Sequence, residues 1–263
     1  MDALLLQLTA LVYLAAGILA GAARVLSHGW LSRAAVVALG AGALLQGLKF
    51  SLLHTADSPP PLTDGPTAVS FMAWIGTVAF LALLWRFRLV GLVALVAPLS
   101  FIGVFYAALS PAAVAEAEVG AGSLPHAHVL LASAGLALLG ISGMAGAAFL
   151  AEYSRLKRKR HLVGSPAWPS LEALDRVNAL ALALGFPLLT LGVVTGALWV
   201  RSLHGAPWTG SAHETWCLLA WLVYAVLVTL RFGLGQGARR SAQTALAGFA
   251  FAGFAVVGVE LLL

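Results

Sequence analysis

Long uninterrupted apolar runs, repeated along the whole chain, constrain this sequence more than any other feature. A bilayer core takes about 20 apolar residues per helical span. In lipid the backbone must satisfy its own hydrogen bonds, which leaves only helices or a closed barrel. The runs are continuous and do not alternate between apolar and polar residues, as the strands of a barrel would. Composition agrees, since 61% of the 263 residues are hydrophobic and 10% are charged.

The sequence therefore predicts an all-α, polytopic membrane protein, with residues 1–263 forming a single integral membrane domain of about eight helices in one bundle. We expect no soluble domain. The predicted spans are Ala3–Leu26, Trp30–His54, Ala68–Trp85, Leu89–Leu109, His126–Tyr153, Val177–Val200, His213–Phe232 and Ser241–Leu262.

Basic residues predict the orientation, because the cytoplasmic loops of membrane proteins carry an excess of Lys and Arg. Of the 15 basic residues, only Lys49 and Arg201 fall outside the cytoplasmic side, and Lys49 is expected to extend toward the membrane surface. Both termini are then outside, and the expected location is the bacterial inner (cytoplasmic) membrane. The cytoplasmic basic residues are Arg24, Arg33, Arg86, Arg88, Arg155, Lys157, Arg158, Lys159, Arg160, Arg176, Arg231, Arg239 and Arg240.

Residues 154–176 are expected to form a cytoplasmic basic loop that touches anionic lipid. Within it, Leu171–Leu174 is expected to be a short interfacial helix ahead of the sixth span. The net charge of +5 comes from short loops, with no aromatic and basic surface of the kind that binds nucleic acid. The lipid bilayer is therefore the expected partner, and nucleic acid is not.

Histidines on the outer face are the side chains best suited to chemistry. His128 and His213 stand in the first turns of two spans that enter from outside, so both imidazoles lie at one membrane level. A helix N-terminus disfavours the charged imidazolium, and the neutral ring binds metal. Two rings on facing helices could hold an iron macrocycle as its axial ligands. The alternative is that each histidine lies at headgroup level without a ligand; His54 and His204 are expected in loops, and His126 as a loop residue or spare ligand.

Tryptophans gather around the loop at residues 201–213, which we expect on the outer face. Trp199, Trp208 and Trp216 could form an aromatic belt at the membrane surface or a shelf that packs on a porphyrin face. The spacing of Gly192 and Gly196 indicates close helix packing. No Ser/His/Asp set, carboxylate pair or HExxH motif accompanies them, so nothing indicates catalysis by this chain alone.

Several segments resemble the cytochrome c assembly family of the CcsA/CcmC type. The spacing from Trp199 to Trp216 matches the tryptophan-rich motif of that family, and the segment beginning at His128 is similar to one whose histidine is an external haem ligand there. The other similar segments are Pro61–Asp64, Phe71–Trp74, Leu174–Asn178, Leu184–Trp199, Glu214–Trp216 and Leu219–Ala225.

The tryptophan-rich motif is degenerate here. Ser211 stands in place of the family's aspartate, His213 in place of its lysine, and Thr229 in place of a later histidine. The family's last external histidine falls beyond Leu263. This pattern is closer to the HemX/YpjD-like branch, which has a histidine near the start of the equivalent span.

The resemblance implies a haem-binding membrane protein that holds haem b, or hands it over, at the external face for cytochrome biogenesis. His128 and His213 would be the axial ligands, Trp199, Trp208 and Trp216 would line the haem, Arg201 could pair with a propionate, and His54 or His204 could replace His213. Its partners would be other cytochrome c assembly proteins or an apocytochrome. The alternatives are a membrane regulator or scaffold acting through the basic loop, a b-type electron carrier and a transporter.

Overall fold

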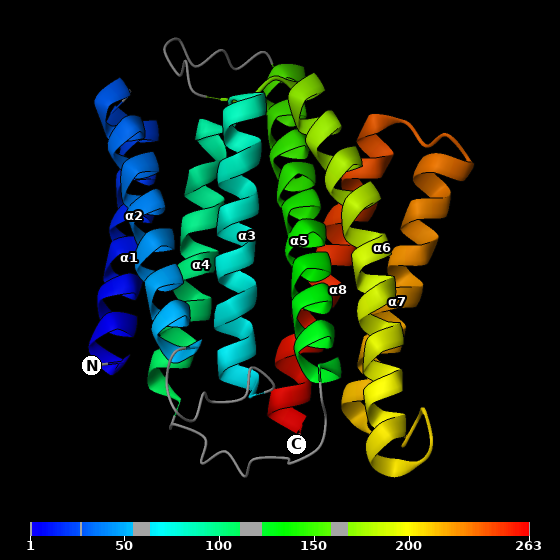
Figure 1. Ribbon diagram of the computed structural model, residues 1–263. Coiled ribbons are helices and arrows are strands. Elements are labelled where there is room, and N and C mark those ends of the chain that lie inside the picture. Colours follow the sequence, from blue (N-terminus) through cyan, green and yellow to red (C-terminus); the bar gives the residue numbers. More distant parts are fainter. Residues whose placement is uncertain (1, 27, 55–63, 111–122, 159–167, 263) are drawn as a thin grey trace. The chain divides into compact units, whose positions relative to one another are not determined.

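The computed structural model describes residues 2–26, 28–54, 64–110, 123–158 and 168–262, with the backbone alone for residues 2–3, 53–54 and 256–262. Every regular element in these ranges is helical, which confirms the all-α prediction (Figure 1). The α-helices are α1 (Asp2–Leu26), α2 (Gly29–His54), α3 (Gly65–Phe87), α4 (Val93–Leu109), α5 (Leu124–Lys157), α6 (Leu171–His204), α7 (Ala212–Val228) and α8 (Ala238–Leu262). The short helix η1 (Val90–Leu92) precedes α4, and the π-helical turn η2 (Thr229–Gly233) follows α7.

The helices are long and apolar enough to make this a multi-pass membrane protein. Seven segments among the described residues qualify as candidate spans by length and composition, from Leu4–Leu26 to Ala212–Gly233. The eighth predicted span, Ser241–Leu262, lies within α8, which is 25 residues long. Seven of the eight predicted spans therefore coincide with candidate spans, and the eighth coincides with a long helix.

Helix boundaries follow local sequence chemistry. The Asp64 carboxylate caps α3 by accepting a hydrogen bond from the Thr67 backbone N–H at 3.3 Å. Arg88 ends that helix in the left-handed conformation, with φ at 55°. The expectation of a separate helix at Leu171–Leu174 was wrong, because α6 runs continuously from Leu171. The first turn contains no glycine or proline to interrupt it, and the Glu172–Arg176 ion pair at i,i+4 spacing supports helix here.

The chain divides into two compact units, and the single integral membrane domain expected from the sequence stays a prediction. The first unit comprises residues 1–117 and 155–170, and in it α1 packs against α2 and α4 while α3 packs against α4. A chain of buried hydrogen bonds joins its helices: the Tyr13 hydroxyl donates to Gln46 Oε1 at 2.8 Å, and Gln46 Nε2 donates to the Ser70 carbonyl at 2.8 Å. The expectation that Lys49 extends outward was wrong, because its side chain is buried, with Nζ 5.4 Å from the Phe50 ring centroid.

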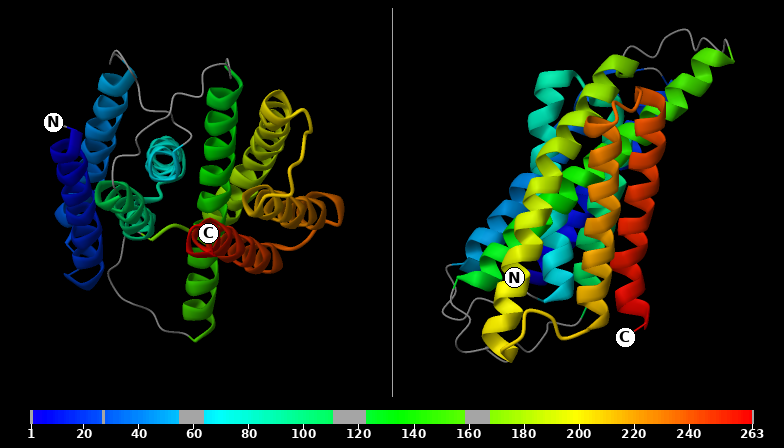
Figure 2. Two further views of the ribbon diagram at one scale, coloured as in Figure 1. Left: turned by 90° about the horizontal axis from the view of Figure 1, so that it is seen from below. Right: turned by 90° about the vertical axis from the view of Figure 1, so that its right-hand side faces the viewer.

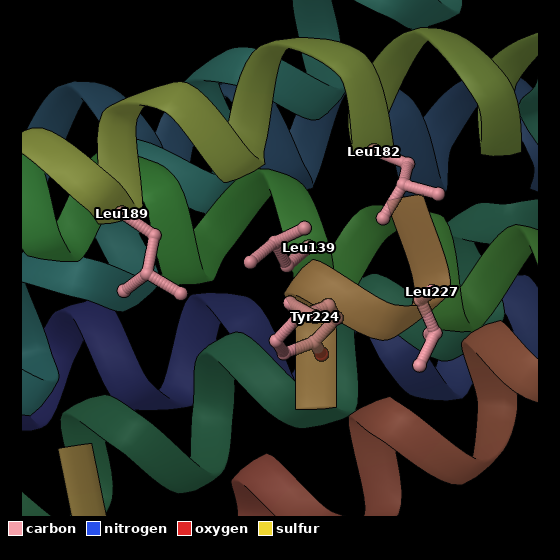
Figure 3. Packing of buried hydrophobic residues seen from close by; sticks show 5 residues of the cluster. All are labelled: Leu139, Leu182, Leu189, Tyr224 and Leu227. Carbon is pink, nitrogen blue, oxygen red and sulfur yellow. The ribbon is translucent and has the colours of Figure 1, made fainter. Parts of the chain in front are cut away.

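The second unit comprises residues 118–154 and 171–263 and contains α5 to α8. Figure 2 shows α7 and α8 side by side, and both α6 and α8 pack against α7. An apolar cluster joins three of these helices (Figure 3). Its buried members are Leu139 from α5, Leu182 and Leu189 from α6, and Tyr224 and Leu227 from α7.

A buried polar network closes one end of the second unit; we call it the asparagine end and define it by Asn178, Ser142, Ser241, Asp175 and Arg231. Asn178 Nδ2 donates to the Ser142 carbonyl at 3.0 Å, and the Ser241 hydroxyl donates to Asn178 Oδ1 at 3.0 Å. Arg231 donates to the Asp175 carboxylate at 2.9 Å. The network ties α5, α6, η2 and α8 together through satisfied side chains.

Candidate functional site

The opposite end of the second unit gathers several of the predicted site residues; we call it the histidine end and define it by His128, Trp199 and His213. Helices α5 and α7 begin there and α6 ends there. The ring of His128 contacts that of Trp199, and His213 lies in the first turn of α7. Residues far apart in sequence on α5 and α6 thus meet here, and the pairing of His128 with His213 stays a prediction.

His128 is held by a backbone carbonyl. It is the fifth residue of α5, is half-buried, and its Nδ1 lies 2.8 Å from the carbonyl oxygen of Gly192 in α6. A carbonyl oxygen only accepts hydrogen bonds, so Nδ1 must carry the proton in this contact. In the neutral ring Nε2 then keeps its lone pair, which is the arrangement found in histidines that ligate metals.

Two glycines of α6 lie beside this ring. A Cβ atom on Gly196 would lie 2.8 Å from both Cε1 and Nδ1 of His128, so no side chain fits there while the ring stays in place. A Cβ atom on Gly192 would lie 2.9 Å from the backbone of Ala132 in α5. The spacing of the two glycines predicted helix packing for both; Gly192 does lie against the helix backbone, whereas Gly196 lies against a side chain.

Trp199 forms the next contact of His128. The two ring centroids lie 6.0 Å apart with an angle of 41° between the planes. The indole Nε1 is buried and has no hydrogen-bond partner within the part of the chain that the structure describes. Leaving a buried donor unpaired costs about 1–3 kcal/mol. A donor of this kind in a native protein therefore calls for an acceptor beyond the described residues, such as a water molecule or a ligand.

His213 is the second residue of α7 and is exposed. Its Nε2 lies 3.6 Å from the Sγ atom of Cys217, one turn further along the helix. A thiol is a weak hydrogen-bonding group, so this contact holds the imidazole less firmly than the carbonyl of Gly192 holds His128. The two histidines therefore differ, one fixed and half-buried and the other exposed and weakly held.

Glu214 orders the loop between α6 and α7. Its carboxylate accepts hydrogen bonds from the Thr209 backbone N–H at 2.8 Å, the Thr209 hydroxyl at 2.7 Å and the Gly210 N–H at 3.1 Å. The Ser211 hydroxyl caps α7 by accepting from the Glu214 N–H at 3.2 Å. No role was expected for Glu214 from the sequence, although the spacing Ser211-x-x-Glu214 is that of a helix-capping box and could have predicted the start of α7.

The family of this chain follows from its similarity to known proteins. The family model described as cytochrome c assembly protein matches residues 65–263. The chain belongs to the cytochrome c assembly protein family. This confirms the family named from the sequence; the closer likeness to the HemX/YpjD-like branch stays a prediction.

Individual relatives agree with the family assignment. The chain is 33% identical over 168 residues to the cytochrome c biogenesis protein CcsA of Synechococcus sp. (strain CC9311), a match that covers 64% of this chain and 54% of that protein. It is 41% identical over 91 residues to CcsA of Thermosynechococcus vestitus and 40% identical over 91 residues to CcsA of Trichormus variabilis; each of these matches covers 35% of this chain, and they cover 28% and 26% of the two relatives. The matches thus extend over about half or less of each curated relative.

The other residues expected near a haem, which are Trp216, Trp208 and Arg201, lie in different surroundings. Trp216 packs on α8, with its ring centroid 6.0 Å from that of Phe251 and 5.6 Å from that of Phe254. Trp208 is exposed in the loop, and Arg201 is exposed in the last turn of α6. The roles suggested for these three side chains at a haem stay predictions.

Three histidines expected in loops belong to helices. His204 is the last residue of α6, where its Nδ1 lies 3.3 Å from the Val200 carbonyl oxygen, and His126 lies in the first turn of α5. His54 is the last residue of α2 in the first unit, and its side chain lies outside the described part. At His204 the helix extends beyond the predicted span, which ended at Val200, because polar residues at a helix end can still make helical hydrogen bonds; His54 and His126 are the end residues of their predicted spans. Most of the basic run at residues 155–160 is described, but Lys159 and Arg160 are not.

Proposed function

We propose that this chain is a haem-binding membrane protein that holds haem, or hands it over, at the external face of the bilayer during cytochrome c assembly. One observation carries the proposal: the Gly192 carbonyl fixes the proton of His128 on Nδ1 and leaves Nε2 free as a ligand. Family membership supports the same direction, because the assembly of c-type cytochromes requires haem. Haem is here the cargo of the protein.

The residues at the histidine end fit a haem. Its iron takes imidazole nitrogen as an axial ligand, which His128 supplies. Its propionates are hydrogen-bond acceptors, which suits the buried N–H of Trp199 that has no partner among the described residues. No group of three or more His, Cys, Asp and Glu side chains capable of holding a bare metal ion occurs among the described residues. A macrocycle that brings four of its own iron ligands needs only one or two from the protein.

His213 is proposed as the second axial ligand. It is the second residue of α7 and is exposed. Ligation through Nε2 would replace its weak contact with Cys217. A ligand held this loosely suits a protein that must release its cargo, since exchange of one axial ligand would leave His128 in place.

Haem b is the proposed form because Cys217 is the only cysteine in the chain, and covalent attachment of haem to a protein uses a pair of cysteines before a histidine. The proposed location is the bacterial inner membrane with both termini outside, in agreement with the distribution of Lys and Arg. Other assembly proteins or an apocytochrome are the proposed partners. Arg201 and Trp208 are exposed around the site, where they could contact either haem or partner.

Optical spectra of the purified protein in detergent, oxidised and reduced, test this function directly. After addition of haem, the wild type should show a low-spin spectrum of bis-histidine iron. His128→Ala should lose haem, and His213→Ala should turn the spectrum high-spin. His28→Ala is the control, since His28 is an exposed histidine of the first unit, and it should leave the spectrum unchanged. A wild-type protein that takes up no haem would overturn the proposal.

A further inference from the structure

We propose that one face of α6, formed by Gly192, Gly196 and Trp199, is a seat that fixes the ring of His128 in the Nδ1–H tautomer and presents Nε2 alone. The three positions are spaced i, i+4 and i+7 and therefore share one helix face. The Gly192 carbonyl accepts a hydrogen bond from the imidazole, Gly196 leaves space for the ring, and the Trp199 indole packs beside it. The presentation of Nε2 to haem rests on the proposed function; the fixed ring and its tautomer do not.

The carbonyl of Gly192 selects the tautomer. Because it accepts the Nδ1 proton at 2.8 Å, the other tautomer would place two acceptor atoms against each other. A hydrogen bond from the far nitrogen of a ligating histidine also raises the basicity of the nitrogen that binds the metal. The seat therefore sets both which nitrogen is free and how strongly it binds.

Gly196 acts as a positioning residue through the space that it leaves. A methyl group there would come within 2.8 Å of Nδ1, the atom that donates to Gly192. The atoms that must yield belong to the end of a side chain with rotatable bonds, so Gly196→Ala would displace the imidazole and leave the helix backbone in place. The hydrogen bond to Gly192 and the contact with Trp199 would both be lost.

Gly185 offers a matched control on the same helix. A Cβ atom there would lie 2.9 Å from Leu139 Cγ and 3.1 Å from the Gly135 carbonyl oxygen, on the packed face toward α5. Gly185→Ala should therefore strain helix packing without touching His128. If Gly196 served only helix packing, the two variants would behave alike.

The first measurement uses the haem-free, full-length protein in detergent, labelled with ¹⁵N in its histidines. The signal assigned to His128, by its absence in His128→Ala, should report Nδ1–H in the wild type and in Gly185→Ala. In Gly196→Ala it should become a mixture of both tautomers. A pure Nδ1–H signal that persists in Gly196→Ala would contradict the proposal that Gly196 positions the His128 ring.

The second measurement is haem titration of the same variants. We expect Gly196→Ala to weaken haem binding about 10- to 100-fold, as does loss of the groups that orient a metal-binding histidine, while Gly185→Ala keeps the wild-type affinity. Equal losses of haem affinity in Gly196→Ala and Gly185→Ala would contradict the proposal that Gly196 positions the His128 ring. A wild type that binds no haem, with its tautomer still shifted by Gly196→Ala, would overturn the proposed function and support the seat.

If Gly196→Ala folds poorly, the double variant Gly196→Ala with His128→Ala shows whether the clash with His128 is the cause. The smaller side chain at 128 makes room for the added methyl group, so the double variant should be as stable as His128→Ala alone. A double variant as unstable as the single Gly196→Ala protein would show that the methyl group clashes with something else and would overturn the seat.

Discussion

The two ends of the second unit share α5 and α6 but use their polar groups in opposite ways. At the asparagine end, Asn178 joins α5 and α8, and Arg231 is paired with Asp175. At the histidine end, the Trp199 N–H is buried without a partner among the described residues, and His213 is exposed with a weak thiol contact. A satisfied polar network stabilises a fold, whereas unsatisfied groups cost stability and are expected where something else binds. This contrast is the one expected between a structural end and the binding end that we propose.

The ion pair at the asparagine end should give the largest effect on stability. Asp175→Ala leaves the Arg231 side chain, which is 14% exposed, without its partner carboxylate. Loss of one partner of a buried pair costs about 3–5 kcal/mol, and the partial exposure of this pair places the expected loss in unfolding free energy near the lower value. Denaturant unfolding in mixed micelles measures it. Glu172→Ala, which breaks the exposed pair with Arg176, should change stability by less than about 1 kcal/mol. Equal effects would show that the pair is not structural.

Asn178→Ala should lower the unfolding free energy by about 1–3 kcal/mol, because it removes the acceptor of the buried Ser241 hydroxyl and the hydrogen bond to the Ser142 carbonyl. His128→Ala at the other end should change it by much less while abolishing haem binding. Unfolding and haem titration of both variants measure the two properties together. The contrast between the ends would fail if His128→Ala destabilised the protein as much as Asn178→Ala.

Trp199→Phe keeps an aromatic wall beside His128 and removes only the unpaired N–H. We expect haem affinity to fall about 3- to 10-fold, equivalent to the net worth of one hydrogen bond, with no loss of stability. Trp221→Phe is the matched control, since its Nε1 donates to the Thr190 hydroxyl at 2.9 Å. That variant should lose stability and keep its haem affinity. Unchanged haem binding in Trp199→Phe would show that the N–H does not serve the ligand.

Tyr224→Phe should have the smallest effect, and it compares an unpaired group outside the histidine end with the unpaired N–H of Trp199. The Tyr224 hydroxyl is also buried without a partner in the described part of the chain, but it lies within the apolar cluster between the two ends. Removing it should leave haem binding unchanged and stability equal or slightly higher, by up to about 1 kcal/mol, since an unsatisfied hydroxyl is lost. Thermal unfolding measures this. A clear loss of stability would mean that the hydroxyl has an acceptor, such as a buried water.

The sequence by itself determined the fold class and the placement of the spans, and it predicted the pair His128 and His213. These follow from local properties: apolar run length dictates membrane helices, and position in a span dictates the membrane level of each side chain. The same local reasoning failed for Lys49, which was expected to extend outward and is buried. Burial depends on which helices pack around a residue, and run length carries no information on that.

Only the tertiary structure decided what holds the candidate site. The acceptor for His128 is a backbone carbonyl, which every residue possesses, and nothing in the sequence singles out that of Gly192, 64 residues away. The space at Gly196 depends equally on how α5 and α6 lie against each other along their lengths. The sequence could therefore name the imidazole, but the nitrogen left free for a ligand is set by contacts between helices, which exist only once the chain has folded.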